Sequence, residues 1–513
     1  MMNNRVLANV AVVTICVLFA AGNIRADVQV DRMFSDHMVL QRDMPVPVWG
    51  TASPGEEITV AFAGQEKKTK AGKDGKWMVK LDPLKLGEPG KMIVSGKNSV
   101  TFEDVLIGDV WVGSGQSNMA GGAGGYARRD EVLAKMVQGG PYPKLRLYRG
   151  TWQESTPANN SGFSALHFSF GQPLQKELGV PVGLIVGAVG GTPSGRWLTG
   201  EMFKADEGCR KMLKDLLAKN PPEKAQMKYK EDLEKWEKAA KLAREQGKKP
   251  PRKPRAPAIP GDVSNLGDLY RAKIEPAVPY AIRGVFWDQG ESGTRIAGID
   301  QYTTMGGLIS GWRKAWGQDF PFLYVQKPSG GGCAWDKDDP VTRMANDFTP
   351  LPAAAKDDGK YRELHIRIMD HPNTAMVTAS DLGSGIHPVN KSGYGARAAQ
   401  VALGFVYKKD VPIYGPIYDS HKIEGNKVRV KFKHVGKGLA FRHGDKLQGF
   451  AIAGDDKVFH WADATIDGDT VVLSSKKVSK PVAVRYGWGR NHTWANLFNK
   501  DGLPALTFRT DDW

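Results

Sequence analysis

The sequence predicts an α/β protein whose mostly parallel central sheet is flanked by β-rich regions, and three observations lead to this prediction. Short β-rich runs separated by turn residues occupy residues 28–104. Apolar, strand-like runs alternate with helix-permissive stretches over residues 105–410. Alternating β patterns return from about residue 412 to the end. A chain of 513 residues is expected to form two to four domains, at roughly 100–200 residues per domain.

The first 26 residues have the pattern of an export signal. Arg5 supplies a positive start, residues 6–21 are almost wholly apolar, and Ala26 is the small residue that a signal peptidase requires. An uncleaved anchor is the alternative. No later run reaches the roughly 18 apolar residues of a spanning helix. We therefore expect a secreted or periplasmic protein with no membrane span in the mature chain.

Each of the three regions has its own predicted elements. The N-terminal region, residues 27–104, is expected to be a β-sandwich with strands at residues 45–50, 58–62 and 77–81. The α/β domain, residues 105–410, has short apolar runs that suit strands buried on both faces of a parallel sheet. Its predicted strands are residues 105–112, 182–186, 284–287 and 322–325, and its predicted helices are residues 302–316 and 395–407. Residues 411–513 are expected to form a C-terminal β domain.

A basic stretch at residues 202–262 interrupts the α/β alternation. It holds 17 Lys and Arg against 10 Asp and Glu, a surplus of 7, in a chain with a formal net charge of +16. Its pattern predicts a helix that ends by Gly247 and a proline-rich connector after it. A solvated helical insertion is the simpler interpretation, and a basic surface that attracts anionic glycans is the alternative. Nucleic acid is not an expected partner, because no recognised binding motif accompanies the charge.

The cysteines and histidines do not predict a metal ion or a cofactor. Cys16 lies in the predicted signal, and Cys209 and Cys333 are compatible either with one disulfide or with two separate buried thiols. The 10 histidines include no His-Glu-x-x-His pair, and the chain has no Cys-x-x-Cys.

The most informative motif is Gly-Gln-Ser-Asn-Met at residues 115–119, which follows the apolar run at residues 105–112. A sharp turn after a buried strand lifts a serine hydroxyl from the backbone, where a nearby base can activate it as a nucleophile. Gly115 permits such a turn, so Ser117 is the candidate nucleophile. The motif differs from Gly-x-Ser-x-Gly, because Met119 replaces the last glycine. A plain turn is the alternative interpretation.

A serine nucleophile requires a base, and His387 is the candidate. It lies in a Gly-, Ser- and Pro-rich loop before the predicted helix at residues 395–407, and such loops at a sheet edge often carry catalytic side chains. Acyl transfer also requires donors for the developing oxyanion. Gly191 and Gln289, each after a predicted strand, are candidates. Each of these three residues is also compatible with a structural role only.

Taken together in chain order, these motifs resemble the sialate O-acetylesterase family, whose members are SGNH-type serine esterases that remove acetyl groups from sugars. The shared segments are Gly-Gln-Ser-Asn-Met at 115–119, Gly-Gly-Thr-Pro at 190–193, Trp-x-Gln-Gly-Glu at 287–291 and Ile-His-Pro-x-Asn-Lys at 386–391. The resemblance covers nearly the whole mature chain. It implies an SGNH-hydrolase-like, three-layer domain with a mostly parallel sheet between N- and C-terminal β-sandwich-like domains.

The resemblance implies roles for individual residues. Ser117 would be the nucleophile, and His387 would be the general base and then the general acid. The backbone amides of Ser117 and Gly191 and the side chain of Gln289 would form the oxyanion hole.

The sequence departs from the family at the position that orients the histidine. The family often has an aspartate two residues before the histidine, where this chain has Gly385. That carboxylate normally orients the imidazole and stabilises its charged form. Three alternatives remain open: Asp381, if the loop folds back; Glu291; or a Ser–His dyad steered by a backbone carbonyl. A milder departure is Asp288, where the family favours tyrosine.

These observations predict an exported serine esterase, a carboxylic ester hydrolase that removes O-acetyl groups from sialic acid or another acetylated carbohydrate. Arg196 is a candidate to meet a substrate carboxylate, or else a surface residue. The expected partners are an acetylated carbohydrate and, through the basic stretch, anionic glycans. An exported glycan-binding protein on a weakened hydrolase scaffold is the alternative of a different class, and a general lipase or thioesterase is a third possibility.

Overall fold

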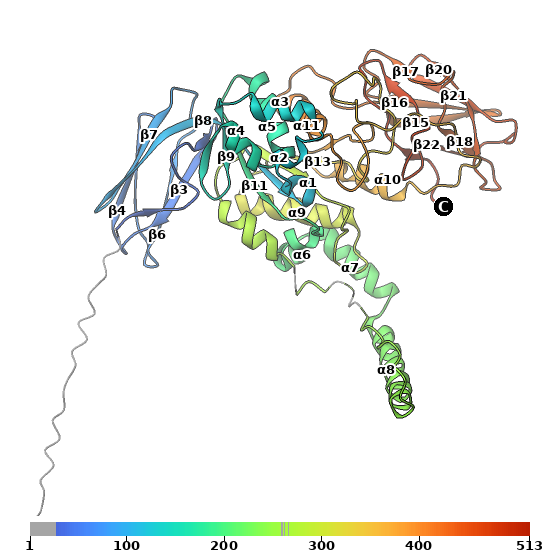
Figure 1. Cartoon of the computed structure of the whole chain (residues 1–513), viewed down its shortest axis with the longest axis horizontal. Coiled ribbons are helices and arrows are strands. Elements are labelled where there is room, and N and C mark those ends of the chain that lie inside the picture. Colours follow the sequence, from blue (N-terminus) through green and yellow to red (C-terminus); the bar gives the residue numbers. More distant parts are fainter. Residues whose placement is uncertain (1–26, 258–259, 261, 265) are drawn as a thin grey trace, which may run out of the picture.

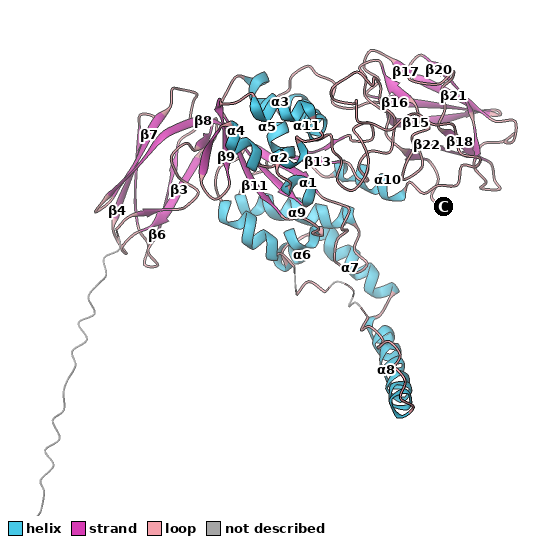
Figure 2. Ribbon diagram, in the orientation of Figure 1, coloured by secondary structure: helices cyan, strands magenta, loops and turns pink. Residues whose placement is uncertain are grey.

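The structure, a computed structural model, describes residues 27–513 except 258–259, 261 and 265, so the predicted signal at residues 1–26 lies outside the described residues. Its central sheet has the strand order β10-β9-β11-β8-β12-β13-β14. Neighbouring strands pair in parallel from β9 to β14, and β10 pairs antiparallel with β9. Helices surround this sheet (Figure 1, Figure 2). This arrangement confirms the predicted α/β class.

The predicted strands of the central sheet correspond to β8, β11, β12 and β13, whereas β9, β10 and β14 were not predicted. Lys144 and Arg146 interrupt the apolar pattern of β9. The strands are β8 (Ser99–Gly115), β9 (Tyr142–Tyr148), β10 (Trp152–Ser155), β11 (Val182–Ala188), β12 (Gly284–Asp288), β13 (Phe322–Val325) and β14 (Thr374–Val377).

Helices cover both faces of the central sheet. Because successive residues of a strand point to opposite faces, each strand contributes side chains to both interfaces. On one face, Trp111 and Phe286 pack in a buried cluster with Phe170 of α5. On the other face, Trp287 packs against Trp312 of α9. The helices are α1 (Ser117–Ala120), α2 (Ala123–Tyr126), α3 (Glu131–Gln138), α4 (Pro157–Gly162), α5 (Ala165–Leu178), α6 (Gly200–Ala205), α7 (Glu207–Lys219), α8 (Pro222–Glu245), α9 (Gln301–Trp316), α10 (Lys360–Arg367) and α11 (Lys391–Phe405).

One long strand, β8, belongs both to the N-terminal sheets and to the central sheet. Its first residues pair antiparallel with β7, and its last residues pair in parallel with β11 and β12. The strand therefore runs through the predicted boundary at residues 104 and 105, and the division of the chain into domains stays a prediction. The other N-terminal strands are β1 (Gln29–Val30), β2 (Val39–Gln41), β3 (Val46–Thr51), β4 (Glu57–Phe62), β5 (Gln65–Lys70), β6 (Lys76–Leu81) and β7 (Gly90–Ser95).

Eight C-terminal strands form two four-stranded sheets, with the orders β15-β16-β21-β20 and β19-β18-β22-β24, and β17 pairs with β23 in a separate two-stranded sheet. Val430 and Val471 of the first sheet share one buried cluster with Ile452 and Val484 of the second, so the sheets pack face to face. The strands are β15 (Ile417–Glu424), β16 (Lys427–Lys433), β17 (Leu439–Phe441), β18 (Phe450–Ala453), β19 (His460–Trp461), β20 (Asp463–Asp467), β21 (Thr470–Ser474), β22 (Ala483–Tyr486), β23 (Leu497–Asn499) and β24 (Phe508–Arg509).

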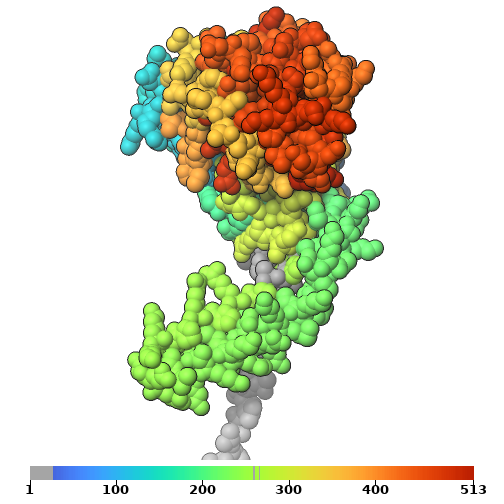
Figure 3. All heavy atoms as spheres, turned by 90° about the vertical axis from the view of Figure 1, so that its right-hand side faces the viewer, coloured from blue at the N-terminus to red at the C-terminus, as the bar shows by residue number. Residues whose placement is uncertain are grey.

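The basic stretch divides into a packed part and a projecting arm. The α7 helix packs on α9, where the buried Cys209 thiol donates to the carbonyl oxygen of Thr303 at 3.5 Å. The α8 helix extends away from the body (Figure 1, Figure 3). The connector folds back on it, because Trp236 Nε1 donates to the carbonyl oxygen of Pro251 at 2.7 Å.

Cys209 and Cys333 are separate, buried, free thiols, which is one of the two predicted alternatives. Among the described residues, no helix combines the length and the apolar character that a membrane span requires.

Candidate active site

The Ser117 turn is built where β8 and β12 end side by side. Gly115 has a φ of +126°, and a Cβ atom there would collide with the carbonyl oxygen of Asp288. The backbone amide of Gln116 donates to that same oxygen at 2.8 Å. Only glycine fits this approach, and the chain then turns sharply so that Ser117 begins α1.

The His387 ring lies against this serine. Its Nε2 atom is 2.8 Å from Ser117 Oγ, although the two residues are 270 positions apart in the chain. His387 belongs to the exposed loop between β14 and α11. A hydroxyl that donates to an imidazole is arranged to lose its proton to that base as it attacks a carbonyl carbon. The structure thus brings together the predicted nucleophile and the predicted base.

The loop that contains Gly191 passes directly beside the nucleophile. A Cβ atom on Gly190 would lie 3.5 Å from Cβ of Ser117, and Gly191 has a φ of +68°. Within the described part of the chain, the backbone amides of Ser117 and Gly191 donate no hydrogen bond. Both are available to a substrate oxygen, which is what an oxyanion hole requires.

Gln289 stabilises this loop through hydrogen bonds of its buried side chain. Its buried side-chain amide donates to the carbonyl oxygens of Thr192 at 3.2 Å and of Gly293 at 3.0 Å. Its Oε1 accepts from Gln301 at 3.0 Å. A role as oxyanion donor would require these bonds to be exchanged, and so that role stays a prediction.

The structure places two other predicted site residues in ion pairs. Asp381 is buried, and its Oδ2 lies 2.8 Å from Nη2 of Arg397. Among the described residues, no hydrogen bond joins Asp381 to His387. Arg196 is partly exposed, and its Nε lies 3.0 Å from the Asp268 carboxylate. Neither side chain reaches the Ser117–His387 pair in this arrangement.

Glu291 accepts hydrogen bonds from the residues on both sides of the nucleophile. Its carboxylate accepts from the side-chain amide of Gln116 and from Asn118 Nδ2, the latter at 3.3 Å. Lys327 Nζ lies 2.8 Å from Glu291 and 2.8 Å from Asp288, and all three groups are largely or fully buried. Although burial alone would lower it, these two carboxylates raise the pKa of Lys327, which therefore stays charged beneath the site.

Asn118 links the nucleophile turn to the histidine loop. Its Nδ2 also donates to the carbonyl oxygen of Ile386 at 3.1 Å, one residue before His387. Its Oδ1 accepts from Lys391 Nζ at 2.7 Å, which fixes the orientation of the amide. Burial lowers the pKa of Lys391 to about 7. No signal in the sequence alone distinguished Asn118 as a link, because its partners lie 173, 268 and 273 residues away.

A group of side chains with metal-binding atom types lies apart from the Ser117–His387 pair. It consists of His37, Asp104 and Glu154. Arg146 already places a cation there, with Nη2 2.7 Å from Asp104. These contacts give the carboxylate a partner without a metal ion.

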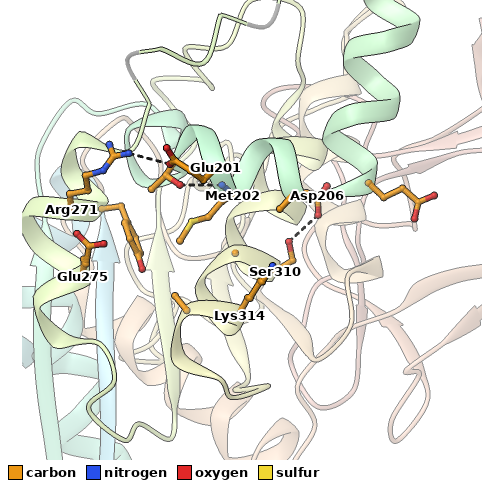
Figure 4. Close-up of a pocket in the computed structure, with 13 residues that line it drawn as sticks. Glu201, Met202, Asp206, Arg271, Glu275, Ser310 and Lys314 are labelled. Carbon is orange, nitrogen blue, oxygen red and sulfur yellow. Dashed lines mark hydrogen bonds and ion pairs between the residues drawn. The ribbon is translucent and has the colours of Figure 1, made fainter. Parts of the chain in front are cut away.

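A hollow of about 690 Å³ lies between α6, the turn at residues 270–274 and α9 (Figure 4). Two contacts within it are the ion pair between Glu201 and Arg271 and the hydrogen bond that Ser310 donates to Asp206 at 2.9 Å (Figure 4). None of the predicted site residues lines it. The hollow therefore does not belong to the Ser117–His387 site.

Comparison with known proteins agrees with this geometry. The sequence profile of the family described as "Carbohydrate esterase, sialic acid-specific acetylesterase" matches residues 107–241. The chain is 26% identical to the sialate O-acetylesterase of Homo sapiens, over 92% of this chain and 91% of that protein. It is also 26% identical to the sialate O-acetylesterase of Rattus norvegicus, over 88% of each chain.

A solved structure extends the similarity to the fold. A carbohydrate acetylesterase from Xanthomonas citri superimposes with a TM-score of 0.71 and 29% identity, over 95% of this chain and 100% of that one. These similarities confirm the resemblance that the sequence motifs predicted.

Proposed function

We propose that this chain, a carboxylic ester hydrolase similar to the sialate O-acetylesterases, removes O-acetyl groups from carbohydrates through an acyl-serine intermediate. The observation that carries the proposal is the 2.8 Å distance between Ser117 Oγ and His387 Nε2. A serine that only formed a turn would not need a histidine from a distant loop at hydrogen-bonding distance.

Two proton transfers at His387 follow from this geometry. In the first step, Ser117 Oγ attacks the acetyl carbonyl carbon and gives its proton to His387 Nε2; the bond from that carbon to the sugar oxygen then breaks, and the sugar oxygen takes the proton. In the second step, a water gives a proton to His387 and attacks the acyl carbon. The bond to Ser117 Oγ breaks, Oγ recovers the proton, and acetate leaves.

The free backbone amides of Ser117 and Gly191 are the proposed donors to the oxyanion in both steps. For Gln289, the contacts with Thr192 and Gly293 support a role in holding the Gly191 loop in place.

Of the three ways to orient the His387 ring, the contacts favour the dyad. Asp381 is occupied by Arg397, and Glu291 by Gln116, Asn118 and Lys327. The Ile386 carbonyl, held by Asn118, positions the histidine loop instead. A protease triad that loses its orienting aspartate without replacement loses about 10⁴ in rate, so this anchoring is important to the proposal.

We propose secretion or a periplasmic location, an SGNH-like three-layer domain between two β-sandwich domains, and a substrate that is O-acetylated sialic acid or another acetylated carbohydrate. The arm, residues 221–257, is proposed to attract anionic glycans through its excess of basic side chains.

The test is acetate release from O-acetylated sugars by the wild type and by Ser117→Ala. The variant is expected to lose about 10³-fold or more of the rate. Ser420→Ala, which changes an exposed serine of β15, is the matched control. Equal rates for Ser117→Ala and wild type would overturn the proposal, and retention on a glycan column would then favour a binding protein. Faster hydrolysis of long acyl esters than of acetyl esters would favour a lipase or thioesterase.

A further inference from the structure

A hollow of about 400 Å³ lies at the carboxyl edge of the central sheet. It forms because β9 ends before its neighbour does: β9 pairs with Val182–Ile185 of β11, whereas residues 186–188 of β11 continue along β8. Those last residues of β11 line the hollow. The carboxyl edge of an open parallel sheet is where α/β proteins bind their ligands.

This hollow adjoins the nucleophile. Ala120, the last residue of the helix that Ser117 begins, lines it. Ala188 also lines it, and this residue pairs with Gly115, two residues before Ser117. A substrate whose acetyl group lies at Ser117 can therefore place a substituent, or a neighbouring sugar, in the hollow.

Three cationic side chains from separate segments line the hollow. Arg32 comes from the N-terminal region, Arg149 follows β9, and Lys273 belongs to the turn at residues 270–274. All three are exposed, and none of the residues that line the hollow is acidic. Within the part of the chain that the structure describes, none of the three forms an ion pair. A group of cations without acidic partners that lines a concave site attracts an anion.

The approach of Lys273 depends on a glycine of β11. A Cβ atom on Gly187 would lie 2.8 Å from the carbonyl oxygen of Lys273. A larger residue would displace the 270–274 turn from the strand. The contact thus places Lys273 beside the hollow that Arg32 and Arg149 also line.

We propose that the hollow is an anion-binding subsite in which Arg32, Arg149 and Lys273 bind a sugar carboxylate next to the acetylated position. Guanidinium groups bind carboxylates through charge-assisted hydrogen bonds, and the ammonium group adds a point charge. The carboxylate belongs either to the acetylated sugar itself or to a neighbouring acidic sugar of a polysaccharide. The inference rests on the proposed acetylesterase function and extends it to the substrate class.

The test compares substrates that differ only in this charge. One pair is an O-acetylated uronic acid glycoside and its carboxamide; a second pair is a disaccharide of an O-acetylated neutral sugar linked to a uronic acid, and its carboxamide. The readout is the ratio of kcat/KM for the acid to that for the amide. We expect the acid to be preferred in at least one pair. We also expect each of Arg149→Ala, Lys273→Ala and Arg32→Ala to lower the ratio about three- to tenfold, mainly through KM.

Lys80→Ala removes an exposed cation of β6 outside the hollow and should leave the ratio unchanged. Added salt should lower the wild-type preference. Equal kcat/KM for acid and amide in both pairs, or a preference that survives in the triple variant, would overturn the inference. That failure would leave Ser117-dependent acetate release from neutral sugars intact, so it differs from a failure of the proposed function.

Discussion

The carboxylate of Asp381 lies 2.8 Å from the guanidinium of Arg397, and both side chains are buried. Arg397 belongs to α11, the helix that follows the histidine loop, so this ion pair fastens the start of the loop to the helix behind it. The nearest acid before His387 in the sequence is therefore a structural anchor in this arrangement, and Asn118 holds the backbone of the histidine loop at the Ile386 carbonyl oxygen.

Asp381→Asn separates these two roles. Breaking a buried ion pair by removing one charge should lower the free energy of unfolding by about 3 kcal/mol, while kcat for acetate release changes by less than about tenfold. Denaturant unfolding and steady-state kinetics measure the two quantities. Arg397→Gln is the matched variant and should cause a similar loss of stability. A 10³-fold fall in kcat with unchanged stability would instead identify Asp381 as the acid of a triad.

Asn118→Ala tests the link between the nucleophile turn and the histidine loop. Without the donor to the Ile386 carbonyl oxygen, the histidine loop no longer holds the His387 ring in a fixed position relative to Ser117. We therefore expect kcat to fall about 10- to 100-fold with little change in KM. Glu291→Gln should produce a smaller fall, because it weakens the contacts to the residues on either side of Ser117. The control is Asn159→Ala in α4, which removes a half-buried amide that contacts Glu154 away from the site. Unchanged kcat in Asn118→Ala would mean that the loop needs no such anchor.

Gly115→Ala tests the turn itself. The added Cβ would collide with the carbonyl oxygen of Asp288 at a φ of +126°, so β8 and β12 would have to move apart. We expect a loss of about 3 kcal/mol or more in the free energy of unfolding, together with loss of activity. Gly125→Ala in α2 has open space around the new Cβ and should have little effect on either quantity. Thermal unfolding and acetate release report the result, and wild-type behaviour of Gly115→Ala would refute this account of the turn.

The stability of the protein should fall in acid partly because of His167. Burial lowers the pKa of this histidine from 6.5 to about 4. Between these values the unfolded chain binds a proton that the folded chain does not, so the stability contributed by neutral His167 is present above the unfolded pKa and is lost as pH falls toward the folded pKa. The contribution lost between pH 7 and pH 5 is about 2 kcal/mol.

The measurement compares unfolding free energies of the wild type and His167→Gln at pH 7, 6 and 5. The difference between them should shift by that amount in favour of the variant at the lower pH. The exposed His421→Gln serves as control. A difference that stays constant from pH 7 to pH 5 would show that His167 takes up its proton in the folded state as readily as in the unfolded chain.

Local sequence determined the type of chemistry. The turn at Ser117 follows from an apolar strand and a glycine that permits a positive φ, and both are properties of neighbouring residues. The same holds for the α/β class, because alternating apolar runs predict strands and helices without reference to distant contacts. The strands missed by sequence reasoning, such as β9 with its two charged residues, are those in which tertiary pairing overrides a weak local pattern.

The partners of the side chains were decided only by the tertiary structure. Asp381, Gln289 and Arg196 each have a residue type suited to the predicted site, yet they bind Arg397, Thr192 and Asp268. The hollow with three cations likewise exists only because β9 ends before β11 and three distant segments meet there. A charged or amide side chain binds whatever lies within a few ångströms of it, and those neighbours are set by how strands and loops far apart in the chain come together.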